Sequence, residues 1–111
     1  MLDPRVTKLA ELLCSHSTKL TADDKVLIHA FDIPDEVVAE VVRVAHAKGA
    51  QVALRLESNV ARRQLMLGMT EANTTLIAQI EKYEMEQMTA YIAIRGGHNY
   101  AERSEEHTSE L

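Results

Sequence analysis

The stretch that most constrains the fold spans residues 24–49 and reads DKVLIHAFDIPDEVVAEVVRVAHAKG. Residues 26–31 form a short apolar run with β-branched side chains, which predicts a buried strand. Ile33-Pro34 ends this strand and starts a helix, because proline is tolerated at the first helical position. Asp35 and Glu36 follow in the first turn, where carboxylates favour the positive end of the helix dipole. A strand therefore leads directly into a helix.

The helix predicted from Pro34 has one apolar face, and its end is marked by Lys48 and then Gly49, a natural C-terminal glycine. Apolar residues recur there at spacings of three and four, at Val37, Val38, Val41, Val42 and Ala45. A second strand, residues 51–56, follows almost at once. The three elements form a βαβ unit whose helix must lie on a face of the sheet.

The sequence on either side of this unit predicts further helices and a third strand. Asp3-Pro4 predicts the start of a helix over residues 4–17, Ser58-Asn59 caps a helix over 60–67, and Thr70 caps one over 71–88. Residues 90–95, AYIAIR, predict a third strand that Gly96-Gly97 ends. The helix over 71–88 is expected to bury the side formed by Leu76, Ile77, Ile80, Tyr83 and Met88.

Strands that alternate with helices predict an α/β fold: a three-stranded parallel sheet with flanking helices, half of a doubly wound fold and truncated. Functional sites of such sheets form where strands reach their carboxyl ends. Those ends are Phe31-Asp32, Glu57-Ser58 and Arg95-Gly96-Gly97.

Length and composition limit the classes of function. The 111 residues suit one small domain, and a net charge of −5 argues against a nucleic-acid binder that relies on phosphate contacts. No apolar run approaches the roughly 18 residues of a membrane span, and we see no secretory signal. A single cysteine is compatible with a reducing compartment. We therefore expect a cytoplasmic protein with no nucleic-acid or membrane partner.

Few residues suggest chemistry. The four glycines form no phosphate-binding motif. Cys14 and His16 suggest a nucleophile and a base, but positions two apart on a helix do not face each other, and we interpret Cys14 as a plain buried residue. The five histidines show no metal-ligand spacing. His29, near the end of the first strand, is the most interesting of them, and we interpret it as structural.

Two carboxylates and one loop lie at strand ends. Asp32 and Glu57 could converge as an acid and a base, although we favour capping or solvated acids at both positions. The loop Arg95-Gly96-Gly97-His98-Asn99 is either a glycine turn that leaves the strand or a loop that faces a ligand or a neighbouring domain. We interpret Arg62-Arg63 as a solvated helix face. We assign no catalytic, cofactor-binding or metal-binding residue.

Residues 103–111, RSEEHTSEL, read as an artefact. The codons AGA TCG GAA GAG CAC ACG TCT GAA CTC encode them, and that string resembles the start of a widely used sequencing adapter. The alternative is an ordinary polar tail. We exclude this segment from fold reasoning. The expected domains are therefore residues 1–102, an α/β domain, and 103–111, an adapter-derived tail, with the natural protein continuing beyond Glu102.

The domain also resembles a known family. DPRVTKLAELL near the start, KVLIHAFDIPDEVVAEVVRVAHAKGA in the middle and EMEQMTAYIAIRGGHN at the end are similar to the N-terminal domain of the aminopeptidase T family of metalloaminopeptidases. The match covers nearly all of residues 1–102, and no motif in it is catalytic. His29 stands where we would expect an acidic residue.

The resemblance implies a cytoplasmic, homodimeric enzyme that releases N-terminal residues from peptide substrates. Family members use two divalent metal ions, zinc, cobalt or magnesium, held by Glu, His and Asp of a C-terminal domain, so we carry over no site residue and expect no metal in this fragment. Two metals would activate water and polarise the scissile carbonyl. The competing hypothesis is a free-standing α/β binding module without catalysis.

Overall fold

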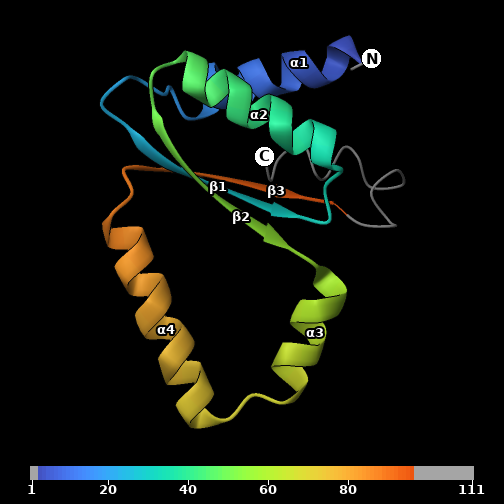
Figure 1. Ribbon diagram of the computed structural model, residues 1–111, viewed down its shortest axis with the longest axis vertical. Helices are drawn as coiled ribbons and strands as arrows, with labels where there is room; N and C mark the ends of the chain where they lie inside the picture. The colour runs from blue at the N-terminus through green and yellow to red at the C-terminus, as the bar shows by residue number, and fades with distance from the viewer. Residues whose placement is uncertain (1–2, 97–111) are drawn as a thin grey trace.

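The computed structural model describes residues 3–96 as helices around one small sheet (Figure 1). The tail over 103–111 and the loop residues after Gly96 lie outside the described residues. The elements in chain order are α1 (Pro4–Glu11), a π-helical turn η1 (Leu12–Ser17), β1 (Lys25–Phe31), α2 (Asp35–Ala47), β2 (Gln51–Glu57), α3 (Asn59–Leu67), α4 (Glu71–Glu86) and β3 (Ala90–Arg95).

The caps expected from the sequence are present. The side chains of Asp3, Ser58 and Thr70 accept hydrogen bonds from backbone N–H groups in the first turns of α1, α3 and α4. Gly49 has a φ of +88°, the left-handed conformation that favours glycine after a helix. Several boundaries differ by one or two residues; for example, Pro34 is the N-cap of α2 and Asp35 is its first helical residue.

The three strands are parallel in the order β2-β1-β3, so the predicted α/β class and three-stranded parallel sheet are confirmed. Ile28 at the centre of β1 pairs with Leu54 of β2 and Ile92 of β3. This order makes β1 the only strand with neighbours on both sides. Its residues from Val26 to Phe31 are all buried.

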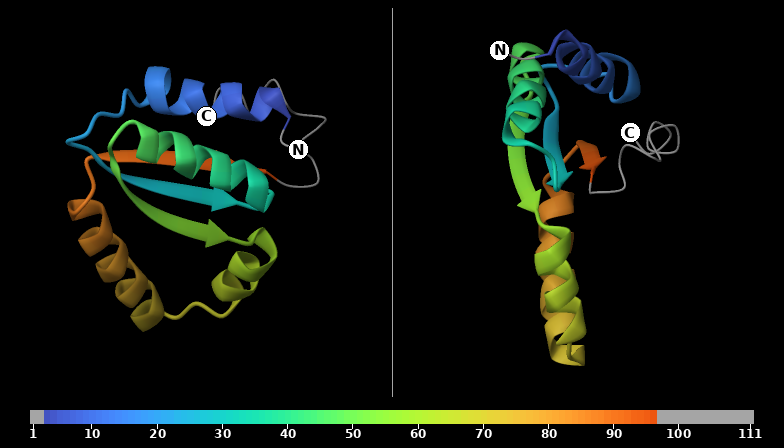
Figure 2. Two further views of the ribbon diagram at one scale, coloured as in Figure 1. Left: turned by 45° about the horizontal axis from the view of Figure 1, so that its top comes forward. Right: turned by 90° about the vertical axis from the view of Figure 1, so that its right-hand side faces the viewer.

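One face of the sheet, here called the dry face, is covered by α1, η1 and α2 (Figure 2). The predicted helix face is right for Val38, Val41 and Ala45, which are buried, while Val42 is half-buried. Val44 is also buried but was not expected. The core is aliphatic and comprises Ala10, Leu13, Cys14, Leu20, Val26, Ile28, Val41, Val44, Ala45, Ala50, Ile92 and Ile94.

One carboxylate is buried between the two covering helices. Glu40 of α2 accepts a hydrogen bond from the Thr7 hydroxyl of α1 at 2.9 Å and two from the Arg43 guanidinium at 2.7 and 2.8 Å. These hydrogen bonds, Arg43 first and Thr7 second, lower the pKa of Glu40 to about 2. The carboxylate is therefore a fixed polar link between α1 and α2.

The prediction that α4 buries one side is wrong. Leu76, Ile80 and Tyr83 are 54%, 52% and 68% exposed, and Ile77 and Met88 are only half-buried. Figure 1 shows α3 and α4 extending away from the sheet beyond β2, and neither helix has a buried side chain. Apolar residues do recur at helical spacing along α4, but no other part of residues 3–96 covers the side of the helix that they form. None of the helices described over 3–96 is long and apolar enough to cross a bilayer.

Candidate functional site

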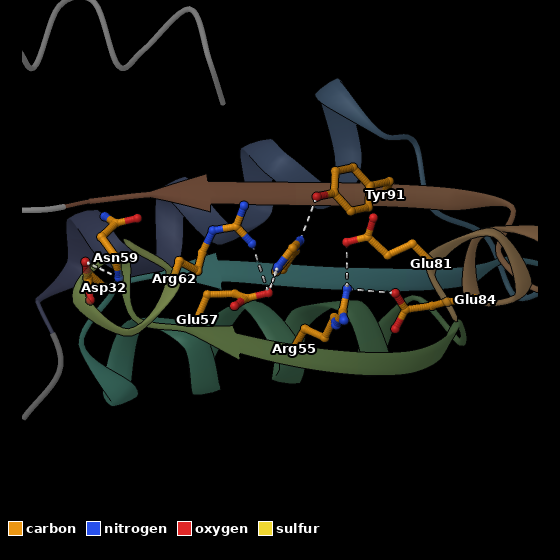
Figure 3. A network of polar contacts seen from close by, with 9 residues as sticks. Asp32, Arg55, Glu57, Asn59, Arg62, Glu81, Glu84 and Tyr91 are labelled. Atoms are coloured by element: carbon orange, nitrogen blue, oxygen red, sulfur yellow. Dashed lines mark hydrogen bonds and ion pairs between the residues drawn. The ribbon is translucent and has the colours of Figure 1, made fainter. Parts of the chain in front are cut away.

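The opposite face of the sheet, here called the polar face, carries a chain of polar contacts (Figure 3). Side chains alternate between the two faces of a strand, so every second residue of each strand belongs to it. In the parallel register, His29 lies between Arg55 and Ala93, and Phe31 lies between Glu57 and Arg95. The polar face therefore collects charged groups from all three strands.

His29 is the centre of this chain of contacts and is 7% exposed. Its Nδ1 lies 2.8 Å from the Tyr91 hydroxyl of β3, and its Nε2 lies 2.8 Å from Glu57 Oε2 of β2. An ionised carboxylate can only accept, so Nε2–H donates to Glu57. In this tautomer Nδ1 accepts a hydrogen bond from the Tyr91 hydroxyl, so both ring nitrogens have a partner. His29 thus links the three strands, consistent with a structural role.

The order Tyr91, His29, Glu57 has the form of a nucleophile, a base and a group that orients the base. The pKa of the Tyr91 hydroxyl argues against its use as a nucleophile. Desolvation by burial raises the pKa of the Tyr91 hydroxyl, and the nearby Arg95 and Arg55 only partly offset it. A phenol that gives up its proton less readily is a poor nucleophile, so the arrangement suits a structural hydrogen bond better than covalent chemistry.

The two strand-end carboxylates do not form an acid–base pair. Asp32 accepts a hydrogen bond from the backbone N–H of Asn59 at 3.1 Å, at the start of α3. Glu57 instead contacts His29 and, at 3.6 Å, the Arg62 guanidinium. Figure 3 shows the two carboxylates engaged with separate partners. The favoured capping interpretation thus describes Asp32, while Glu57 belongs to the polar network.

The interpretation of Arg62-Arg63 as a solvated helix face holds for Arg63, which is exposed, but only in part for Arg62, which is half-buried and makes specific contacts. The Arg62 guanidinium carbon lies 5.4 Å from the centre of the Phe31 ring, and that of Arg95 lies 4.3 Å from it. Figure 3 shows Arg62 reaching from α3 over the sheet. Sequence reasoning missed this cluster because no spacing rule relates a residue of α3 to the ends of β1 and β3.

Gly96, the first glycine of the Arg95–Asn99 loop, lies where a side chain would clash with neighbouring atoms. A Cβ on Gly96 would lie 2.8 Å from the backbone oxygen of Asp32 and 3.0 Å from Ile33 Cδ1. The Gly96 N–H also donates to the Phe31 carbonyl at 2.8 Å. The chain leaving β3 is therefore held against the end of β1, which brings Arg95 beside Phe31.

Ion pairs make a second link from the polar face, this time to α4. The Arg55 guanidinium lies 3.1 Å from Glu84 and 3.9 Å from Glu81 (Figure 3). All three groups are partly exposed, and exposed ion pairs contribute little to stability, about 0–1 kcal/mol. The sheet end of α4 is thus attached through charge and not through an apolar core.

Cys14 and His16 do not cooperate. Cys14 is fully buried, its Sγ lies 3.9 Å from the Val41 carbonyl oxygen, and desolvation, followed by the charge of Glu11, raises the pKa of the thiol. His16 is exposed. A buried thiol with a raised pKa carries little thiolate, so Cys14 behaves as a core residue, as predicted.

The described residues do not fit a dimetal site. Among residues 3–96, no group of three or more His, Cys, Asp or Glu side chains is placed to hold a metal ion. Glu57, the carboxylate within 4.0 Å of a histidine in residues 3–96, is already shared between His29 and Arg62.

No family model and no curated protein matches this chain. The resemblance to aminopeptidases of the T family therefore stays a prediction.

Proposed function

We propose that this chain is the N-terminal α/β domain of a metal-dependent aminopeptidase, and that it docks against the domain that carries the metals. The three stretches behind the family resemblance fall on α1, on β1 with α2, and on β3 with the end of α4. They thus include two of the three strands and both helices that cover the dry face, but not β2. Under this proposal the chain supplies a scaffold and the catalytic groups lie elsewhere.

The uncovered apolar surface is the observation that carries this proposal. Large apolar side chains on β2, α3 and α4 are 44–81% exposed: Leu54, Leu56, Val60, Leu65, Met66, Leu67, Leu76, Ile80, Tyr83 and Met85. Monomeric proteins rarely leave contiguous apolar patches of more than a few hundred Å² in water. Exposed apolar side chains in this number suit a domain that is covered by another domain or subunit.

The proposed whole enzyme is a cytoplasmic homodimer that releases N-terminal residues from peptides. Its two divalent ions, zinc, cobalt or magnesium, would activate water and polarise the scissile carbonyl. No group of this chain is assigned a part in that step.

The decisive test compares this chain with the protein encoded by the uninterrupted gene. Both are assayed on a leucine-derived chromogenic substrate with added zinc or cobalt. We expect the longer protein to turn over the substrate and to lose activity to a chelator, and the 111-residue chain to show none. Metal-dependent turnover by the short chain, or chelator-insensitive activity of the long one, would contradict the proposal.

The second candidate is a free-standing binding module, which the same apolar surface also favours because a partner protein could cover it. The uninterrupted gene sequence separates the two candidates. A stop codon soon after Tyr100 supports the module, whereas a reading frame that continues into Glu- and His-rich sequence supports the peptidase.

A further inference from the structure

The ring of Phe31, at the carboxyl end of β1, has two guanidinium groups and the His29 ring beside it. Phe31 is 3% exposed, with the Arg95 guanidinium 4.3 Å, the His29 ring 4.2 Å and the Arg62 guanidinium 5.4 Å from its centre. Guanidinium groups stack on aromatic faces and keep their N–H donors at the edges free for other partners. Two arginines of different elements thus lie beside the same ring.

These two arginines differ from those that the fold uses for structure. Arg43 makes two short hydrogen bonds to Glu40, and Arg5 makes three to Asp3. Within residues 3–96, Arg95 has no carboxylate within 4.0 Å, and the only one near Arg62 is Glu57 at 3.6 Å. Glu57 itself makes a shorter contact, 2.8 Å, to His29.

The position is also one where parallel sheets bind ligands, at the carboxyl ends of the strands. The Arg62 side chain is 40% exposed and Arg95 is exposed, so both groups can be reached from solvent. Gly96 follows Arg95 without a side chain and is held against Asp32.

We propose that Arg62 and Arg95, held on Phe31, form a binding site for one small oxyanion, the carboxylate or phosphate group of a ligand. Each guanidinium donates N–H groups to the anion's oxygens, and such charge-assisted hydrogen bonds are the stronger ones in proteins. The site is independent of the proposed peptidase function and needs no metal.

The test is an NMR titration of the 111-residue chain with inorganic phosphate and, separately, with acetate, at constant ionic strength. We expect saturable shifts of the Arg62 and Arg95 Nε–H signals. Arg95→Gln and Arg62→Gln should each weaken binding by roughly tenfold or more, as expected on losing a charged hydrogen-bond donor. Arg63→Gln, one residue further along α3 and exposed, is the matched control and should bind as the parent does.

The two ligands identify the source of the anion. Saturation by phosphate alone assigns a phosphate group, and saturation by acetate assigns a carboxylate; either supports the site. If Arg62→Gln unfolds, Arg62→Lys replaces it, since lysine keeps the charge but loses the planar fork. No saturable shift with either anion, or unchanged binding by Arg95→Gln, overturns the proposal.

Discussion

The two faces of the sheet are covered by different kinds of side chain. The dry face is covered by α1 and α2 through aliphatic contacts, and its strand residues Val26, Ile28 and Ile92 are almost inaccessible. The polar face buries Leu27, His29 and Phe31 as deeply, under the ring of Tyr91 and long charged side chains. Burial alone therefore does not distinguish the faces, but the chemistry of the covering groups does.

This difference indicates where the domain is complete and where it is open. The aliphatic packing under α1 and α2 leaves no free donors or acceptors, and the exposed residues of this face are the apolar Leu54 and Leu56 at its β2 edge. The polar face keeps guanidinium donors exposed, and the helices next to it leave apolar side chains uncovered. New partners are accordingly expected on the side of α3, α4 and the polar face.

The largest expected effect tests the dry face. Val41→Asp places an unpaired charge at a position that is 0% exposed, which should destabilise the fold by at least about 3 kcal/mol. Ala39→Asp, on the exposed side of the same helix, should stay within about 0.5 kcal/mol of the parent. Urea unfolding measures both. Equal losses of stability would show that the two sides of α2 are not distinguished as described.

An intermediate effect is expected on the polar face. His29→Ala leaves the Tyr91 hydroxyl and part of the Glu57 carboxylate without a partner, which should cost about 1–3 kcal/mol. His46→Ala, an exposed histidine of α2, is the control and should change stability by less than about 0.5 kcal/mol. Unfolding in urea again measures the difference. If His29→Ala is as stable as the parent, His29 does not join the strands.

The last effect appears as a change of stability with pH and concerns Glu40, the buried carboxylate between α1 and α2. The pKa of Glu40 is lowered from 4.5 to about 2, so its ionised form stabilises the fold above pH 4.5. That contribution is lost as the pH falls from 4.5 to 2. Stability measured across this range should fall less steeply for Glu40→Gln than for the parent, while Glu36→Gln should follow the parent. A parent and Glu40→Gln of identical slope would refute the link between α1 and α2.

Capping residues and apolar spacing predicted most of the helices and strands, because both depend only on residues that are close together in the sequence. The strand over 90–95 and the caps at Asp3, Ser58 and Thr70 depend on neighbouring residues only. The error in α4 has a different origin. Helical spacing shows that Leu76, Ile80 and Tyr83 share a side, but it contains no information on whether anything covers that side.

The candidate site was harder to predict than the fold. His29, Glu57 and Asp32 were recognised one by one, yet their partners depend on the register of three parallel strands. Arg62 was misjudged because an arginine on a polar helix is usually solvated, and only the path of α3 brings it over Phe31. Side chains that meet across three elements have no signature in a single run of sequence.

The central position of β1 has a kinetic consequence. His29 reaches Glu57 across 28 residues but Tyr91 across 62, and each doubling of a loop adds only about 0.6 kcal/mol to the cost of closing it. During synthesis, however, β3 is made after β1 and β2. The edge of β1 that later pairs with β3 therefore has no partner strand until β3 is complete. His29 is the only polar side chain in the run VLIHAF, and at that stage it interrupts an otherwise aggregation-prone edge. We therefore expect the imidazole that joins the three strands also to lower the tendency of the unpaired β1 edge to aggregate.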